Sequence, residues 1–282
     1  MIRIKPLYIL IILTSVFSLI EMVGNPTLSL SQETSETPQE VIPTESEETP
    51  ETPQLNAIEW YNQGVDKIEA GDYQEAIAAF TESIKLDDND PDSYYNRGYS
   101  YLVLEQFQEA INDYNQAIEL NPDFAYAYGN RCYAYYQLTN NENAITDCSK
   151  AIELEPNYPD FYIYRGNAKD DLEMHESAIV DYNQAIALNE NNAKAYYNRA
   201  LAYNRLGQSL KAVADYTKAI ELNPNFADAY HNRGVTQFKL EETEKAIADL
   251  QKAAALFKDQ GNTDNAQHAL NTIKTLQQES SL

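Results

Sequence analysis

The feature that most constrains the fold of this chain is a period of 34 residues that recurs six times. One column of the repeat is alanine in every copy, a second is always aromatic, and a third, four residues later, holds only Gly, Cys or Ala. A fixed period of this length is typical of a solenoid, because a unit of this size cannot bury its apolar face alone. The copies are 57–90, 91–124, 125–158, 159–192, 193–226 and 227–260, and the alanine column is Ala76, Ala110, Ala144, Ala178, Ala212 and Ala246.

Each copy is predicted to form two helices joined by a turn. In the second copy, Glu105-Gln106 separates two apolar stripes of helical spacing and therefore predicts the turn. Asn121-Pro122 predicts the end of the second helix, since proline lacks the N–H and disfavours helical backbone at the preceding residue. The stripes are Tyr94, Gly98, Tyr101 and Leu102, then Ala110, Ile111, Tyr114, Ala117 and Ile118. Three copies lack the proline and have Asp88, Glu190 or Lys258 in its place.

These strings resemble the tetratricopeptide repeat family. The match is carried by Tyr94-Tyr95-Asn96-Arg97-Gly98, Ala110-Ile111-Asn112-Asp113-Tyr114 and Asn121-Pro122, and by their counterparts across 57–260. The resemblance implies an all-α, right-handed α-solenoid of six helix-turn-helix units with a concave face that accepts ligands. Segment 261–282 breaks the period but keeps an apolar stripe at helical spacing, which predicts a C-terminal capping helix.

The first 56 residues have a different character. Arg3 and Lys5 precede the apolar run 7–20, which is the pattern of a signal peptide. Segment 1–31 is therefore expected to be either a signal peptide, cleaved near Ser29-Leu30-Ser31, or an uncleaved N-terminal anchor. Both alternatives place the repeats outside the cytoplasm, as a periplasmic, lumenal or secreted protein or as a membrane-anchored one. Segment 32–56 is rich in Glu, Thr and Pro and is predicted to be a disordered acidic linker.

Composition and motif content exclude several classes of function. The net charge is −24, from 44 acidic and 20 basic residues, so nucleic acid is not an expected partner. The acidity predicts a well-solvated surface. The three histidines, His175, His231 and His268, lack metal-ligand spacing, and neither a phosphate loop nor a nucleophile elbow is present. We therefore expect no catalytic residue, no cofactor and no metal, and we do not expect an enzyme.

One pair of columns predicts an ion pair within each repeat. In five copies an arginine directly precedes the small residue, and an aspartate lies sixteen residues after that arginine. Residues equidistant from the turn of a helical hairpin face each other, so each pair should fix the register of its hairpin. A row of arginines that binds an anionic ligand is the alternative. The pairs are Arg97–Asp113, Arg131–Asp147, Arg165–Asp181, Arg199–Asp215 and Arg233–Asp249.

The column before those arginines supplies the candidate binding residues. By resemblance to the repeat domain of O-linked N-acetylglucosamine transferase, its asparagines line the inner face and bind the backbone of an extended peptide. The alternative is that they bridge neighbouring first helices. Tyrosines on the same side of the first helices suit a groove, because tyrosine gives a large amphipathic contact. The candidates are Asn62, Asn96, Asn130, Asn198 and Asn232, with Tyr95, Tyr99, Tyr133 and Tyr197.

A lysine column that would recognise acidic C-terminal tails is absent, since that column reads Tyr61, Tyr95, Gly129, Ile163, Tyr197 and His231.

The two cysteines, Cys132 and Cys148, are also sixteen residues apart in one repeat, symmetric about a turn near Asn140. In an oxidising compartment they are expected to form a disulfide, and the alternative is two reduced residues in the core.

The sequence thus predicts an exported, non-enzymatic scaffold that binds an extended peptide or a partner helix in its concave groove. The alternative is a membrane-tethered assembly factor that binds folded partners through its outer face. In both cases the expected partner is a protein or peptide, and membrane contact is made only through the N-terminal segment if it is uncleaved.

Overall fold

The computed structural model describes residues 55–279, which form thirteen helices and no strand. The predictions for segment 1–31 and for nearly all of the linker 32–56 fall outside this range. None of the helices within it is long and apolar enough to cross a bilayer. The helices are α1 Ala57–Ala70, α2 Tyr73–Leu86, α3 Pro91–Val103, α4 Phe107–Leu120, α5 Ala125–Gln137, α6 Asn141–Leu154, α7 Pro159–Asp171, α8 His175–Leu188, α9 Ala193–Arg205, α10 Ser209–Leu222, α11 Ala227–Lys239, α12 Thr243–Asp259 and α13 Thr263–Glu279.

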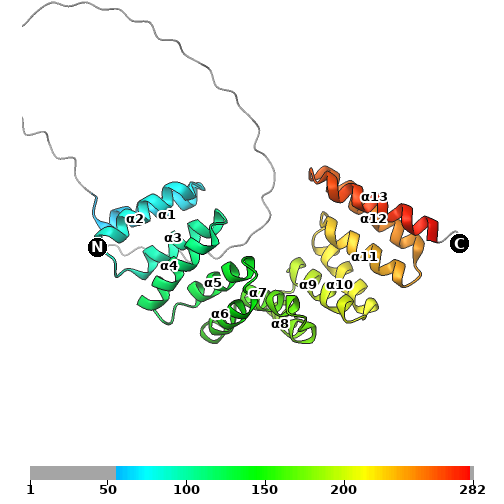
Figure 1. Cartoon of the computed structure of the whole chain (residues 1–282), viewed down its shortest axis with the longest axis horizontal. Coiled ribbons are helices and arrows are strands. Elements are labelled where there is room, and N and C mark those ends of the chain that lie inside the picture. The colour runs from blue at the N-terminus through cyan, green and yellow to red at the C-terminus, as the bar shows by residue number, and fades with distance from the viewer. Residues whose placement is uncertain (1–54, 280–282) are drawn as a thin grey trace, which may run out of the picture.

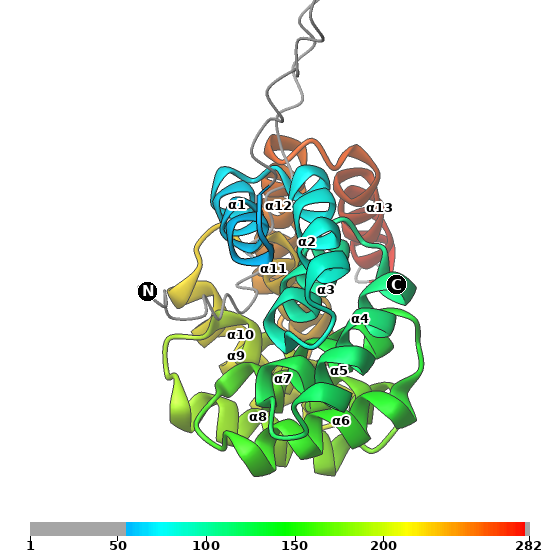
Figure 2. The ribbon, with the colours of Figure 1, turned by 90° about the vertical axis from the view of Figure 1, so that its left-hand side faces the viewer.

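Consecutive helices pair into six hairpins, from α1–α2 to α11–α12, and α13 packs on α12. The first helix of each hairpin also contacts the first helix of the neighbouring repeats. The hairpins therefore form an arch, with first helices such as α5 and α7 on its inner side and second helices such as α6 and α8 on its outer side (Figure 1). Seen end-on, α1 and α2 lie in front of α11, α12 and α13, and α6 and α8 lie at the bottom, at the middle of the arch (Figure 2). The predicted all-α solenoid is confirmed.

The turn inside each hairpin depends on one residue in the left-handed region. It is glycine at Gly71 and Gly207, where a positive φ is free of steric cost, but Thr139 adopts the same conformation with φ 58°. The second helices end at an extended residue such as Asn121 or Asn189, with or without a following proline. In the sixth repeat Phe257 occupies that column and is buried, so α12 continues to Asp259.

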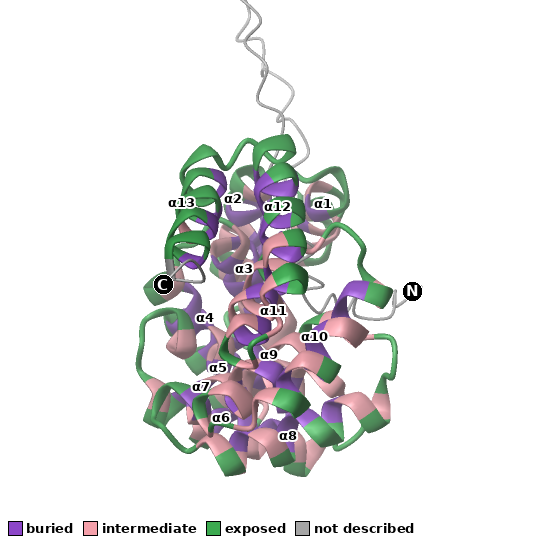
Figure 3. Cartoon of the chain, turned by 90° about the vertical axis from the view of Figure 1, so that its right-hand side faces the viewer, coloured by how far each residue is buried: buried purple, intermediate pink, exposed green. Residues whose placement is uncertain are grey.

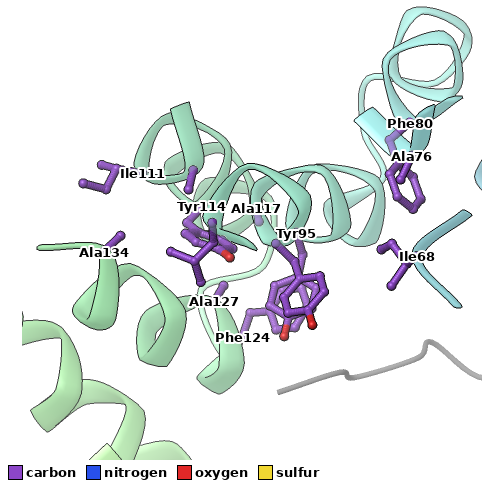
Figure 4. Close-up of a cluster of buried hydrophobic side chains, with 13 residues drawn as sticks. Ile68, Ala76, Phe80, Tyr95, Ile111, Tyr114, Ala117, Phe124, Ala127 and Ala134 are labelled. Carbon is purple, nitrogen blue, oxygen red and sulfur yellow. The ribbon is translucent and has the colours of Figure 1, made fainter. Parts of the chain in front are cut away.

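The core lies between the helices of each hairpin and between neighbouring hairpins (Figure 3). The alanine column is fully buried, and so is the aromatic Tyr114. A Cβ at Gly98 would lie 3.0 Å from Cε1 of Tyr114, which explains why that column holds small residues. Tyr95 packs on Phe124, the residue that directly precedes α5, at 4.8 Å between ring centroids, so the core continues toward the next hairpin (Figure 4).

The five predicted arginine–aspartate pairs are confirmed. In the second repeat, Nε and Nη2 of Arg97 donate to the carboxylate of Asp113 at 2.8 and 2.7 Å. The third nitrogen, Nη1, donates to Oγ1 of Thr81 in the preceding repeat at 3.1 Å, and the guanidinium lies 5.7 Å from the ring centroid of Tyr94. Each arginine thus fixes one hairpin and links it to the previous one. Because these groups are already paired, the geometry does not favour the anion-binding alternative. The other Nη1 acceptors are Asn115, Ser149, Asn183 and Thr217.

Cys132 and Cys148 form a disulfide across the third hairpin, with 5.4 Å between their Cα atoms. Both side chains are fully buried. They occupy the small-residue column and the large-residue column of that repeat, so the covalent bond stands where the first, second and fourth repeats have a glycine packed against an aromatic ring.

Candidate functional site on the inner face

The asparagine column lies on the inner side of the arch and joins neighbouring first helices. Nδ2 of Asn96 donates to the hydroxyl of Tyr61, and Nδ2 of Asn130 donates to that of Tyr95, both at 3.1 Å. Nδ2 of Asn232 donates to the hydroxyl of Tyr197 at 2.8 Å. In each case the tyrosine belongs to the preceding repeat, 35 residues earlier. We call this series of bonds the Tyr–Asn ladder.

The ladder corrects part of the predicted peptide-binding set. Asn96 and Asn130 are only 2% and 1% exposed, and Tyr95 and Tyr99 are 1% and 6% exposed. These four side chains lie within the packing between first helices, so they do not present a surface to a ligand. For Asn96 and Asn130 the alternative interpretation, an amide that bridges neighbouring helices, is the one that the structure supports. The remaining predicted residues, Asn62, Asn198, Asn232, Tyr133 and Tyr197, are partly exposed.

The ladder is interrupted on both sides of the fourth repeat. Its own asparagine is replaced by Tyr164, and the residue that would bond to it is Gly129, which has no hydroxyl. A Cβ at Gly129 would lie 2.0 Å from Cε1 of Phe161, so close packing requires glycine there. Tyr164 instead packs on Tyr133, with 5.0 Å between ring centroids.

The second interruption concerns Asn198. Its expected partner is Ile163, which cannot accept a hydrogen bond. Nδ2 of Asn198 therefore donates to Oδ1 of Asn167 at 2.8 Å, and the hydroxyl of Tyr182 donates to the same oxygen at 2.9 Å. The loss of one hydroxyl thus redirects an amide from the helix packing into a polar cavity.

That cavity has a volume of about 140 Å³ and lies where α5, α7 and α9 meet. One of its lining residues is Asp170, whose side chain is only 6% exposed. The carboxylate of Asp170 pairs with the guanidinium of Arg205 and lies 2.6 Å from Nδ1 of His175. Arg205 keeps 44% of its side chain exposed, so it pairs with Asp170 and also lies at the edge of the cavity. The lining residues are Tyr136, Asn167, Asp170, Asp171, Tyr182, Asn198, Leu201 and Arg205.

The cavity also contains a tyrosine with a perturbed hydroxyl. Burial, and after it the negative charge of Asp171, raises the pKa of Tyr136 to about 12. The hydroxyl therefore stays protonated at neutral pH and can donate a hydrogen bond. Together with the amides, it gives the cavity donors and acceptors in a small space.

A larger depression of about 580 Å³ lies over α7 and α8 and includes the exposed Val180. It is an open surface, and its charged groups, Arg165 and Asp181, already pair with each other. We therefore regard the smaller cavity as the better candidate site despite its size. No group of His, Cys, Asp and Glu side chains within residues 55–279 has the arrangement of a metal site.

Comparison with known proteins assigns the family. Sequence models described as tetratricopeptide repeat match residues 91–124, 125–158, 193–226 and 215–248, and a model described as TPR repeat matches 66–105 and 171–207. No curated protein sequence matches the chain.

Solved structures agree. The crystal structure of MamA is 28% identical over 58% of this chain and 96% of its own, with a TM-score of 0.54. That of YrrB, described as a TPR protein with an unusual peptide-binding site, is 27% identical over 68% of this chain and 98% of its own, with a TM-score of 0.55. The APC/C hetero-tetramer Cut9–Hcn1 is 20% identical over 76% of this chain and 43% of its own, with a TM-score of 0.64, and shares the fold.

Proteins of this kind are in general non-enzymatic scaffolds for protein interaction, and the fold of this chain supports the same broad role. The family matches together cover residues 66–158 and 171–248, which is more than half of the chain. The chain therefore belongs to the tetratricopeptide repeat family.

Proposed function

We propose that this protein is a non-enzymatic scaffold that binds an extended peptide segment, or a helix of a partner protein, against the inner face of its third to fifth repeats. The observation that carries the proposal is the interruption of the Tyr–Asn ladder beside the cavity. Elsewhere the amides and hydroxyls of the ladder bind each other. Among the described residues, it is around α7 that such amide and hydroxyl groups line a space that a ligand could fill.

The chemistry of the cavity suits a peptide group. Oδ1 of Asn167 accepts two hydrogen bonds, but within the described residues its Nδ2 and the Oδ1 of Asn198 make none. A free amide donor beside a free amide acceptor matches the C=O and N–H of a main chain. Tyr133 and Tyr197 lie partly exposed on the same side and offer amphipathic contacts at little entropic cost. The site would thus bind main chain with limited dependence on sequence.

Two further observations support the proposal. YrrB, which is 27% identical, is described as having a peptide-binding site, although an unusual one. The buried disulfide between Cys132 and Cys148 is in keeping with an oxidising compartment, and hence with the export that the N-terminal sequence predicts. We infer that the scaffold acts outside the cytoplasm. Recovery of intact Met1 by N-terminal sequencing from the native host would instead favour the membrane-tethered alternative.

The test is a peptide selection followed by a matched pair of variants. The full chain is immobilised and used to select binders from a random peptide library. Asn167→Ala together with Asn198→Ala should weaken a selected peptide by about 2 kcal/mol, or about 30-fold, at roughly 1 kcal/mol for each lost hydrogen bond. Asn157→Ala, at an exposed loop position, serves as the control and should bind like wild type. Equal affinity in the double variant, with its melting curve unchanged, would contradict the proposal.

A further inference from the structure

A second unusual group lies at the N-terminal end of α7, an aspartate with tyrosines before and after it in the chain. Asp160 lies in the first turn of α7, one turn before Tyr164, so both project from the same side of the helix. Tyr164 packs on Tyr133 of α5 at 5.0 Å. Tyr158, which directly precedes α7, contacts Tyr126 with 5.7 Å between the ring centroids. Aromatic rings from two neighbouring repeats therefore pack together in the part of the inner face where α7 begins.

The charge of Asp160 is felt by both nearby hydroxyl groups. Burial is the main cause that raises the pKa of Tyr158 and of Tyr164, and the charge of Asp160 is the next cause in each case. In the chain, Tyr158 directly precedes α7, Asp160 is in its first turn, and Tyr164 follows Asp160 by one helical turn. The same tyrosines are partly exposed, so the group is accessible from the inner side of the arch.

Asp160 itself lies in an unfavourable environment for a charged side chain. Burial raises its pKa to about 6. Lys194 on α9 is the only described residue whose charge opposes this shift, and no hydrogen bond contributes to it. The buried Asp113 and Asp181 differ, because each accepts two hydrogen bonds from an arginine. A partly desolvated carboxylate without a bound counter-charge destabilises the fold, and such groups concentrate at functional sites.

We propose that Asp160, with Tyr133, Tyr158 and Tyr164, forms the binding site for a lysine or arginine side chain of the bound segment. The carboxylate supplies the opposite charge, and the tyrosine rings contact the apolar stem and the cationic head. This inference rests on the proposed function and specifies the chemistry of its ligand.

Charge complementarity favours a basic partner over an acidic one. An acidic side chain at this place would be repelled by the carboxylate of Asp160. The chain as a whole carries −24, which attracts cationic segments at long range.

The experiment repeats the random-peptide selection with the full wild-type chain and with Asp160→Asn. Asp259→Asn, an exposed position at the end of α12, is the matched control. Wild type and control should enrich peptides that contain Lys or Arg, whereas Asp160→Asn should still select peptides but without this preference. For one selected peptide, Asp160→Asn and replacement of its basic residue by Gln should each weaken binding about tenfold, and the double change should weaken it little further.

The outcomes separate this inference from the proposed function. If wild type selects peptides without enrichment of Lys or Arg, the scaffold function stands and the cation site is wrong. If the two losses simply add, Asp160 does not pair with the basic residue and the inference is again wrong. If no peptide is selected at all, both proposals fail. Thermal unfolding shows whether a loss of binding merely reflects a loss of structure. Asp160→Asn should be at least as stable as wild type.

Discussion

The first three repeats and the fourth repeat have the same fold but different inner faces. In the former, Tyr61–Asn96 and Tyr95–Asn130 close the space between first helices and bury their polar groups. At the fourth repeat, Gly129–Tyr164 and Ile163–Asn198 cannot form such pairs, and polar groups turn toward a cavity of about 140 Å³. The comparison teaches that the solenoid is maintained by the core and the arginine pairs. The ladder is therefore dispensable in one place, and that place is where we expect binding.

The arginine pairs should show the largest effect and a difference between the two regions. Arg97→Ala leaves Asp113 buried without its partner, which should cost about 3–5 kcal/mol. Arg165→Ala should cost clearly less, because Nζ of Lys169 remains 2.8 Å from Asp181. Urea unfolding of both variants measures the difference. Equal losses would show that Lys169 does not compensate. An effect below about 1 kcal/mol at Arg97 would place these pairs among weak surface contacts.

The disulfide in the third repeat borders the interruption and should contribute next. Reduction, or Cys132→Ala with Cys148→Ala, should lower the free energy of unfolding by about 3 kcal/mol at most, since the closed loop is short. Denaturation with and without a reductant gives the value. A free-thiol titration of the denatured, unreduced protein should detect no thiol, and two thiols would show that the bond does not form in the native protein.

The two kinds of asparagine should respond differently to alanine. Asn130→Ala removes the buried hydrogen bond that the amide donates to the hydroxyl of Tyr95, so it should destabilise the fold by about 1–3 kcal/mol. Asn198→Ala, at the partly exposed interruption, should cost less stability but should weaken peptide binding. Thermal melts give the change in stability of each variant, and peptide titrations give the change in its affinity for the peptide. The reverse pattern, with Asn198 the more important for stability, would remove the distinction between the two regions.

The smallest effect is the pH dependence that Asp160 confers. Its pKa in the folded protein, about 6, lies above the ordinary value of 3.8, so the folded state binds the proton more tightly than the unfolded state does. The carboxylate therefore destabilises the fold above pH 6, and this penalty disappears as the pH falls through 6 toward 4. Asp160→Asn should exceed wild type in stability by on the order of 1 kcal/mol at pH 7, after allowance for solvent screening, and by less at pH 4.5. The facing groups are Lys194 and three tyrosines, Tyr133, Tyr158 and Tyr164, and burial raises the pKa of each tyrosine further above that range. A difference that is independent of pH would contradict the assignment.

The sequence predicts the fold because the period alone fixes which faces must stack. The arginine–aspartate pairs and the cysteine pair follow from the same spacing of sixteen residues, which is a property of a single hairpin. The bonds between repeats were missed. A signal was present, since a hydroxyl or amide side chain such as Thr81 stands sixteen residues before each arginine.

The inner face was predicted less well, for a physical reason. Whether Asn96 faces a ligand or the hydroxyl of Tyr61 depends on the distance between two repeats. That distance is not readable from one column. The spacing of 35 residues between Tyr61 and Asn96, and its loss at Ile163, is visible in the sequence. Its meaning requires the packing of the helices, and so does the burial of Asp160.

The central claim is that the interruption of the ladder at the fourth repeat creates the binding site. Hydrogen exchange of the full chain, measured with and without a peptide from the selection, tests it most directly. We expect peptide-dependent protection in α5, α7 and α9, strongest in α7, with no change in α1 to α3. Protection centred on α1 to α3, or on the outer helices α6 and α8, would contradict the account.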